Sequence, residues 1–464
     1  MFMRSVHLTC AVALAVVLAN PCFSEPVRGD ELEQKFRAAK AKLLQDLRSL
    51  KPEIRAAALK KFAEFPVPDA ASTLLLQGEI TRYPDVRQGS FEVLRSYRNS
   101  EPVAKVLVTD VLRELKSTQA DDATGIKLYV LLSADDPQVK ELAATALTQL
   151  EKSPHAAPVM IMVVDQLAAM ADGPSCQALV NIADHPLGAS HQGLKRAIVQ
   201  ALCKINEKDA VQRLVDFHLG SEGETRADIE RRLQQLSGYT SEDKPDWSSW
   251  WAEKKEKFVF PGAAPMKQEG LFANAAPQRP NPPAIDKPGT TTPSYYGLPL
   301  YGSRIVFVID YSGSMAGAQM DAAKRELQNA VSVLPATVKF NIIAFHSEVI
   351  PWKRELQPVS PAIKQEATLW VASGVPTQKT NSYGALEAAL AQDCDAIYFL
   401  TDGSPTTGKV TDPGQIVTLI SRQNRIRRAT INVLGIGVGG EGDRFDRFLK
   451  NIAEQNFGVY RRLD

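Results

Sequence analysis

The sequence has little cysteine and almost no excess of charge. Its 464 residues contain five cysteines, and no two of them form a C-x-x-C pair. This scarcity indicates neither a disulfide framework nor a zinc site. The chain has 54 lysines and arginines against 53 aspartates and glutamates. This balance argues against a protein that binds nucleic acid or anionic membranes through an excess of basic residues. Apolar residues make up 44% of the chain, enough for two or three domains that each bury a core.

Long hydrophobic runs are missing after residue 24. The apolar run before it, Leu8–Leu18, has eleven residues, about half of the roughly 20 that a membrane-spanning helix needs. Arg4 precedes this run and the small residues Cys22 and Ser24 follow it, so we predict a signal peptide over residues 1–24. The mature protein is then exported, to the periplasm or the exterior, with no membrane insertion after cleavage. An uncleaved membrane anchor and lipid attachment at Cys22 are the alternatives.

Three cysteines remain in the mature chain: Cys176, Cys203 and Cys394. We expect buried free thiols, because free cysteine behaves as a small apolar residue. A disulfide between Cys176 and Cys203 is the alternative, if consecutive helical units bring these two thiols together.

Residues 30–240 have the pattern of an all-helical domain. Apolar residues recur at helical spacing, and the breaks fall at proline, glycine and aspartate. Three segments share a proline in the first helical turn, a β-branched residue two positions later and then a basic residue: KPEIRAAALKKFAEF from Lys51, YPDVRQGSFEVLRSY from Tyr83 and DPQVKELAATALTQL from Asp136. A weaker copy starts at Gly188. The pattern resembles HEAT repeats, which are helical hairpins that bury their apolar faces by stacking; a non-repetitive helical bundle is the alternative.

Two short segments separate this domain from the rest of the chain. Residues 241–260 carry Trp247, Trp250 and Trp251 on one face of an expected helix. We interpret them as an apolar cap on the last repeat rather than as a ligand-binding aromatic box. Residues 261–295 are rich in proline, a composition that predicts an extended linker. We therefore expect two globular parts joined by a flexible tether.

Residues 296–464 have the pattern of a doubly wound, Rossmann-like α/β domain. Continuous apolar runs predict strands buried on both faces, and helical patterns separate them. The runs are Ile305–Ile309, Val338–Phe345, Ala396–Gly403 and Ile431–Val438. In such a parallel sheet, ligand sites gather at the carboxyl ends of the strands.

Acidic and hydroxyl side chains stand at those strand ends. Asp310, Ser312 and Ser314 follow the first strand, Asp402 follows the third, and Thr380 precedes a helix on another loop. An all-oxygen set without a neighbouring histidine or cysteine suits a hard cation, Mg2+ or Mn2+, rather than zinc. Because only two of these side chains are carboxylates, a bound ion would attract a further carboxylate from outside. The alternatives are a set of loop and helix caps and a metal site that has decayed.

The motifs DYSGSM, TNSYGAL and TDG, in this order, resemble the metal-ion-dependent adhesion site of von Willebrand factor type A (VWA) domains. The resemblance covers residues 303–464. It implies that the three hydroxyl side chains coordinate the ion directly and that the two carboxylates hold it largely through water. It also implies an open coordination position that an Asp or Glu of a protein partner would fill.

Other charged residues near these motifs have a plain structural interpretation. Lys379 stands where many members of the family have glycine, and we expect its side chain to face solvent. We interpret His346 as a loop residue rather than a ligand or a base. Four arginines, at positions 422, 425, 427 and 428, are interpreted as a solvated helix end rather than a phosphate-contacting patch. The chain contains no nucleophile elbow, zinc-protease motif or glycine-rich phosphate loop.

We therefore hypothesise a non-enzymatic, exported binding protein. Its VWA domain would capture the Asp or Glu of a protein partner through Mg2+, and its helical repeats would offer a surface for a second protein, with no role for nucleic acid. A second hypothesis is an envelope-assembly scaffold in which the metal mainly stabilises the fold. A third, an accessory subunit of a metal-assisted hydrolase, requires a base near the ion.

Overall fold

The chain folds into two compact units, Met1–Val106 and Leu107–Asp464. The structure is a computed structural model that describes residues 27–116, 122–150, 156–171, 173–184, 188, 191–240, 243, 245–261, 293–377, 379–437 and 443–463. The predicted signal peptide and nearly all of the predicted linker lie outside these ranges. Among the helices that are described, none combines the length and the apolar character needed to cross a membrane.

The first unit consists of helices, three of which begin at a proline. They are α1 (Val27–Leu47), α2 (Pro52–Phe62), α3 (Pro68–Ile80), α4 (Pro84–Ser96) and the start of α5 (Glu101–Lys116). Proline is tolerated at the start of α2, α3 and α4 because the N–H groups of the first turn have no intrahelical acceptor.

The basic residue of the first repeat segment links two of these helices. Arg55 of α2 is buried, and its Nε lies 2.7 Å from Asp85 Oδ2 of α4. Its guanidinium carbon is 4.2 Å from the centre of the Tyr83 ring, and Nη1 donates a hydrogen bond to the carbonyl of Ser49 at 2.9 Å. The Pro-x-Ile-Arg element therefore holds neighbouring helices together, in agreement with the repeat interpretation.

Helices also form the first part of the second unit. They are α6 (Asp122–Leu132), α7 (Pro137–Leu150), α8 (Ala156–Met170), α9 (Gly173–Ala183), α11 (Gln192–Leu202), α12 (Lys208–Leu219) and α13 (Gly223–Ser237). The weaker repeat copy predicted from Gly188 contains α11, which packs against α8 and α9. The all-helical prediction for this half of the chain is confirmed.

Aromatic packing closes the helical part. Helix α14 (Trp247–Lys254) contacts α12, and its three tryptophans are buried. The Trp251 ring meets the Phe258 ring edge to face, with the ring centres 5.2 Å apart. This packing favours an apolar cap over a ligand box.

The three cysteines of the predicted mature chain are all buried and free. Cys176 lies in α9, Cys203 follows α11, and Cys394 precedes a strand of the C-terminal domain. The prediction of free thiols is confirmed, and the alternative Cys176–Cys203 disulfide is not formed.

A seven-stranded sheet forms the centre of the C-terminal domain, with the order β5-β4-β3-β7-β8-β9 and with β6 paired to β4. Strands β3 (Arg304–Asp310), β4 (Lys339–Phe345), β7 (Ala396–Thr401), β8 (Thr430–Ile436) and β9 (Tyr460–Leu463) run parallel, whereas β5 (Val349–Pro351) and β6 (Gln357–Pro358) pair antiparallel with β4. A short hairpin of β1 (Ser294–Tyr295) and β2 (Leu298–Pro299) precedes the sheet. The four predicted strands are all present; β5, β6 and β9, which have two to four residues each, were not predicted.

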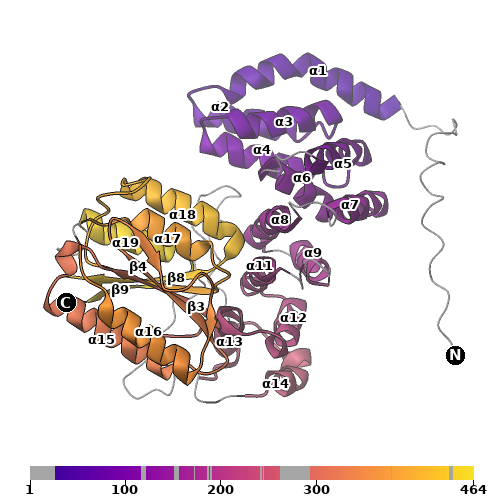
Figure 1. The fold of residues 1–464 in the computed structure, drawn as a ribbon. Coiled ribbons are helices and arrows are strands. Elements are labelled where there is room, and N and C mark those ends of the chain that lie inside the picture. The colour runs from indigo at the N-terminus through magenta and orange to yellow at the C-terminus, as the bar shows by residue number, and fades with distance from the viewer. Residues whose placement is uncertain are drawn as a thin grey trace. The chain divides into compact units, whose positions relative to one another are not determined.

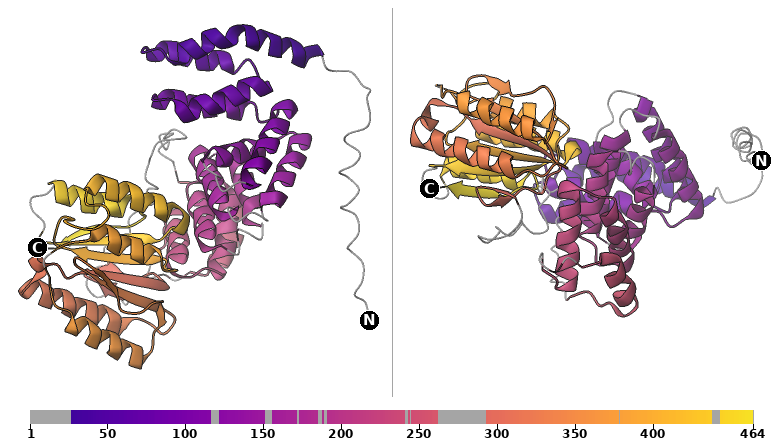
Figure 2. Two further views of the ribbon diagram at one scale, coloured as in Figure 1. Left: turned by 45° about the horizontal axis from the view of Figure 1, so that its top comes forward. Right: turned by 60° about the horizontal axis from the view of Figure 1, so that its bottom comes forward.

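Helices cover both faces of this sheet (Figures 1 and 2). Helices α15 (Ala318–Val333) and α16 (Pro361–Ser373) pack on one face, where Ile305, Phe307 and Ile309 point. Helices α17 (Ser382–Leu390), α18 (Pro413–Arg427) and α19 (Arg444–Glu454) pack on the other, against Val306 and Val308. Because both faces are buried, apolar residues occur on both sides of these strands rather than at alternate positions only, although a few buried polar residues such as Asn341 and Asn432 interrupt them. The doubly wound α/β prediction is confirmed.

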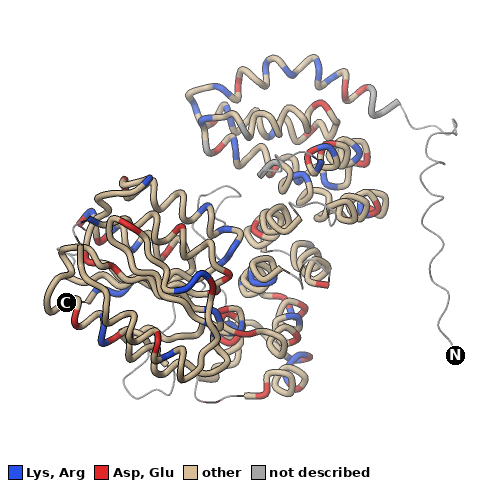
Figure 3. The backbone as a smooth tube through the Cα atoms, viewed as in Figure 1, with Lys and Arg blue, Asp and Glu red and all other residues tan. Residues whose placement is uncertain are grey.

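Basic and acidic residues are interspersed along the described backbone (Figure 3). This distribution matches the balanced composition of the chain, with 54 basic and 53 acidic residues. It gives no support to binding that is driven by charge of a single sign.

Candidate functional site

Two adjacent parallel strands bring the candidate site residues together. Ile309 of β3 pairs with Leu400 of β7, so both strands end at the same edge of the sheet. Asp310 is the last residue of β3, and Asp402 comes two residues after Leu400. The chain leaves β3 through a short 3-10 turn, Gly313–Met315, that carries Ser314.

Three side-chain oxygens converge at this edge. Ser314 Oγ lies 2.8 Å from Asp402 Oδ1 and 3.1 Å from Ser312 Oγ. Ser312 Oγ is 3.5 Å from the same Asp402 oxygen. The structure thus places residues from two separate motifs within one cluster.

Asp310 lies beneath this cluster and is fully buried. Its Oδ1 accepts a hydrogen bond from the backbone N–H of Ser312 at 2.7 Å, and its Oδ2 accepts one from Thr401 Oγ1 at 2.5 Å. Burial raises the pKa of Asp310 to about 6, although both of these hydrogen bonds act to lower it. Sequence reasoning missed Thr401, which could have been found because it directly precedes Asp402 at the end of β7.

Thr380 reaches the cluster from a third loop. A Cβ placed on Gly403 would lie 3.5 Å from both Ser314 Oγ and Thr380 Oγ1, so the two hydroxyl groups border the same small space. The Thr380 backbone is fixed by Thr406: its N–H donates to Thr406 Oγ1, and its carbonyl accepts from the Thr406 N–H, each at 2.9 Å. All five predicted site residues therefore lie at the end of β3 or in loops that meet at one edge of the sheet.

The neighbouring loops are held by local caps. Asn381 caps the start of α17, where its side chain accepts a hydrogen bond from the N–H of Gly384 at 3.0 Å. The Asn381 N–H donates to the carbonyl of His346, also at 3.0 Å. His346 Nδ1 accepts a hydrogen bond from the Glu348 N–H at 3.1 Å. His346 therefore organises a turn, which agrees with its interpretation as a loop residue.

The donor set suits a hard divalent cation. The converging atoms are hydroxyl and carboxylate oxygens, which are ligands for Mg2+ or Mn2+ rather than for zinc. Burial raises the pKa of Asp402 as it does that of Asp310, and a cation between these desolvated carboxylates would favour their ionised forms. Across the described residues, no group of three or more His, Cys, Asp or Glu side chains is arranged to hold a metal, so a cation at this edge would depend on the hydroxyl groups.

The predictions for the basic side chains of this domain have different outcomes. Lys379 is exposed, as predicted. The interpretation of the four arginines as a solvated helix end is wrong for Arg428, which is only 3% exposed. Arg428 has left-handed backbone geometry with φ 59° at the end of α18, and its side chain turns into contact with the helical part of the unit.

Comparison with known proteins points to the C-terminal domain. Residues 303–462 match the family model of the von Willebrand factor type A domain. The chain is 29% identical over 185 residues to inter-alpha-trypsin inhibitor heavy chain H3 of Bos taurus, a similarity that covers 36% of this chain and 20% of the relative. It is 30% identical over 181 residues to heavy chain H4 of Homo sapiens, covering 36% and 19%. The similar region is thus about one fifth of the length of these relatives.

Two solved structures are each similar to about a third of the chain. One is a von Willebrand factor type A protein from Catenulispora acidiphila, with a TM-score of 0.31 and 20% identity, covering 35% of this chain and 38% of that one. Another is the von Willebrand factor domain of the type V pili tip protein Mfa5 from Porphyromonas gingivalis, with a TM-score of 0.27 and 13% identity, covering 34% and 89%.

Proposed function

Since residues 303–462 form a von Willebrand factor type A domain, we propose that this protein is a non-enzymatic binding protein that captures a carboxylate of a protein partner through Mg2+. The observation that carries the proposal is the convergence of Ser312, Ser314 and Asp402, whose oxygens lie 2.8 to 3.5 Å apart. Ser312, Ser314 and Thr380 would hold the ion directly. Asp310 and Asp402 would supply the negative charge.

The charge of the site supports a carboxylate as the partner group. Asp310 accepts hydrogen bonds from Thr401 and Ser312, and Asp402 accepts one from Ser314. These donors already compensate part of the negative charge of the two carboxylates. When bound, Mg2+ would supply a Lewis acid with residual positive charge, for which an Asp or Glu side chain is the matching protein ligand.

The surroundings give little support to hydrolysis at this site. A general base must lie within hydrogen-bond reach of the proton that it removes. His346 is the one histidine in residues 296–464, and its Nδ1 accepts a hydrogen bond from the Glu348 N–H. A carboxylate beside a cation stays ionised and donates no proton. We therefore propose binding, and not catalysis, as the activity of this edge.

The N-terminal segment and the helical part of the chain suggest where the protein acts and what else it binds. The N-terminal run that predicts a signal peptide supports export of the protein, to the periplasm or the exterior. If the helices are repeats, they would offer a surface of the kind that repeat proteins use for binding. We propose that this surface engages a second protein.

Metal binding is tested by calorimetric titration of the purified protein with Mg2+ and with Mn2+. Thr380→Ala removes one hydroxyl from the cluster but keeps the backbone contacts to Thr406, and it should weaken binding strongly. Ser404→Ala is the matched control, since Ser404 is an exposed hydroxyl residue two positions after Asp402. Equal metal affinity in wild type and Thr380→Ala would refute the proposed ligand set.

Partner capture is tested with the mature protein as bait in envelope and secreted fractions of the producing organism. Capture should require Mg2+, and it should be lost in EDTA and with Thr380→Ala. If the same proteins stay bound under all three conditions, the metal edge is not the contact. The scaffold alternative, with a metal that only stabilises the fold, would then be supported.

A further inference from the structure

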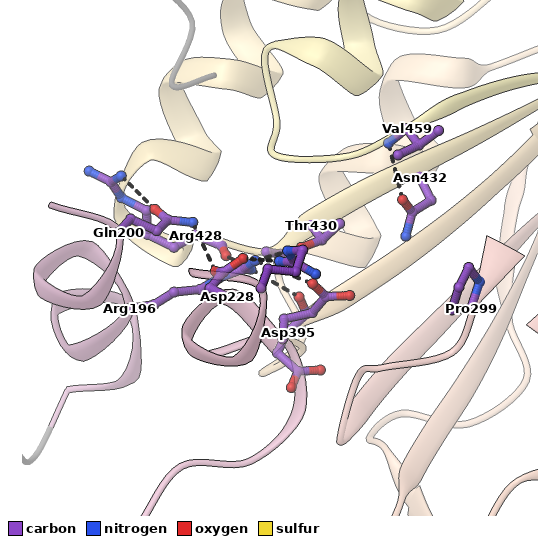
Figure 4. A network of polar contacts seen from close by, with 12 residues as sticks. Arg196, Gln200, Asp228, Pro299, Asp395, Arg428, Thr430, Asn432 and Val459 are labelled. Atoms are coloured by element: carbon purple, nitrogen blue, oxygen red, sulfur yellow. Dashed lines mark hydrogen bonds and ion pairs between the residues drawn. The ribbon is translucent and has the colours of Figure 1, made fainter. Parts of the chain in front are cut away.

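A buried arginine of the helical part enters the C-terminal domain. Arg196 of α11 is 2% exposed. It donates hydrogen bonds to the backbone carbonyl of Arg428 and to Thr430 Oγ1, the latter at 2.8 Å. Thr430 is the first residue of β8. The guanidinium of α11 thus hydrogen-bonds to the segment of the chain that enters β8 (Figure 4).

Two acidic residues of α13 hold this arginine in place. Arg196 Nε lies 2.9 Å from Asp228 Oδ2, and Nη2 lies 3.4 Å from Glu224 Oε2. Both carboxylates are at most 5% exposed. Buried charges are tolerated only when they are paired and hydrogen-bonded, so the helical part presents Arg196 in one fixed orientation.

A second arginine extends in the opposite direction, from the C-terminal domain to the helices. Arg428 of the C-terminal domain donates to Gln200 Oε1 of α11 at 3.0 Å and pairs with Asp165 of α8. Asp165 also pairs with Arg425 Nε of α18, at 3.1 Å. The guanidinium carbons of Arg196 and Arg428 lie 5.6 and 5.3 Å from the centre of the same ring, that of Phe457.

Two glycines allow the backbones to approach closely. A Cβ on Gly223, where α13 begins, would lie 2.0 Å from Asp395 Oδ2 and 2.7 Å from the Ser303 nitrogen. A Cβ on Gly193 of α11 would lie 2.0 Å from the carbonyl oxygen of Ile426. No larger residue fits at either position without moving the helix away from the domain.

The contacts lie at the opposite edge of the sheet from the candidate metal site. Asp395 directly precedes β7, and its carboxylate accepts from the N–H groups of Ser303 and Arg304 at 3.0 and 2.9 Å, where β3 begins. Asp310 and Asp402 stand at the other ends of these two strands. A helical surface docked at the starts of the strands therefore leaves the metal edge free.

We propose that the end of the VWA domain where strands β3, β7 and β8 begin is a dedicated docking surface for helices α8, α11 and α13 of the same chain. Arg196 bonds to the VWA domain and Arg428 bonds to the helices, and these contacts hold the two surfaces together without help from the linker. A partner bound at the metal edge would then meet a rigid body of domain and helices, not a domain on a flexible tether. Docking at this surface does not depend on metal binding.

The test is to cut the linker in the full-length protein. A site-specific protease site is inserted within residues 262–292, the purified chain is cleaved in EDTA, and the products are examined by size-exclusion chromatography with mass detection. When the cleaved protein is loaded at a concentration of about 10 µM, we expect the two fragments to elute together as a one-to-one complex. Separate elution of the wild-type fragments would overturn the proposal, and a complex with two copies of each fragment would overturn the assignment to a single chain.

Variants locate the contact. Arg428→Ala and Thr430→Val should each weaken fragment association, the first by at least about thirtyfold, because each leaves buried polar groups of the other side unpaired. Gly223→Ala should separate the fragments through the clash with Asp395. Arg213→Ala is the matched control, since it removes the exposed Arg213–Asp184 ion pair within the helical part and should leave association unchanged.

Circular dichroism of the uncut variants shows whether each one folds. Thr430→Val changes a hydroxyl for a methyl group of the same shape, so it keeps the test valid if Arg428→Ala fails to fold. Wild-type affinity in Thr430→Val and Gly223→Ala together would contradict the docking geometry. Because the test is run in EDTA, its failure is distinct from a failure of Mg2+ binding.

Discussion

Ser314 Oγ lies 2.8 Å from Asp402 Oδ1 although the two residues are 88 positions apart. The contact exists because β3 and β7 are adjacent and parallel, so that the loops after them meet. It unites the first and third sequence motifs in one cluster of oxygens.

Thr401 should act as a positioning residue for the metal site. Its hydroxyl donates to Asp310 Oδ2, so Thr401→Val removes the hydrogen bond but keeps the shape of the side chain. We expect Mg2+ affinity to fall by about tenfold, the usual cost of losing a partner behind a metal ligand. Calorimetric titration measures this. Thr418→Val, which removes an exposed hydroxyl that donates to Gly414, should have no effect, and equal losses in both variants would contradict the assignment.

Mg2+ affinity should fall as the solution becomes acidic. Burial raises the pKa of Asp310 to about 6, so this carboxylate is ionised at pH 7 and mostly protonated at pH 5. Because the metal requires the ionised form, the apparent affinity should be about tenfold weaker at pH 5 than at pH 7. Titrations across this range test the sign and the midpoint. Asp310→Asn, whose side chain cannot titrate, should show a flatter profile, and an affinity that rises on acidification would be incompatible with the site.

Arg55→Ala should destabilise the first unit. The substitution removes the ion pair with Asp85, the hydrogen bond to the Ser49 carbonyl and the contact with the Tyr83 ring. For a buried and paired arginine we expect a loss of about 2 kcal/mol in the free energy of unfolding. Urea unfolding followed by circular dichroism measures it. Arg37→Ala, which breaks a long, exposed pair with Glu33, should change stability by less than about 0.5 kcal/mol.

Trp251→Ala should lower stability and leave partner capture intact. Trp251 is 1% exposed and packs against Phe258, so its removal opens a cavity that costs about 3 kcal/mol or more. Thermal unfolding measures the loss. If the tryptophan face were a ligand box, the variant would lose a bound partner under conditions where the protein is still folded. Trp251→Phe should recover part of the stability.

The three thiols should be unreactive in the folded protein. Burial raises the pKa of Cys203 and Cys394 to about 12 and that of Cys176 to about 11, so almost no thiolate exists at neutral pH. A thiol reagent should label none of them in buffer and all three after unfolding in urea. Mass spectrometry counts the labels on the mature chain. Only one label after unfolding without reductant would instead reveal a Cys176–Cys203 disulfide.

The amino-acid sequence by itself determined the class of each part of the chain. Proline in the first turn of α2, α4 and α7 marks helix starts, because only there does a missing N–H leave no carbonyl unpaired. Continuous apolar runs indicate β3, β4, β7 and β8, because a strand buried on both faces has no polar side. The positions of Asp310 and Asp402 directly after two such runs placed them at one edge, since parallel strands end together.

Only the tertiary structure decided what depends on contacts between distant segments. The hydrogen bond from Thr401 to Asp310 depends on the register of two strands. The short strands β5, β6 and β9 arise from pairing with longer neighbours and have too few residues to form a pattern of their own. The burial of Arg428 was interpreted wrongly because arginine at a helix end is usually solvated. Its partners Gln200 and Asp165 lie more than 200 positions earlier in the chain, and no local pattern records such a distant pair.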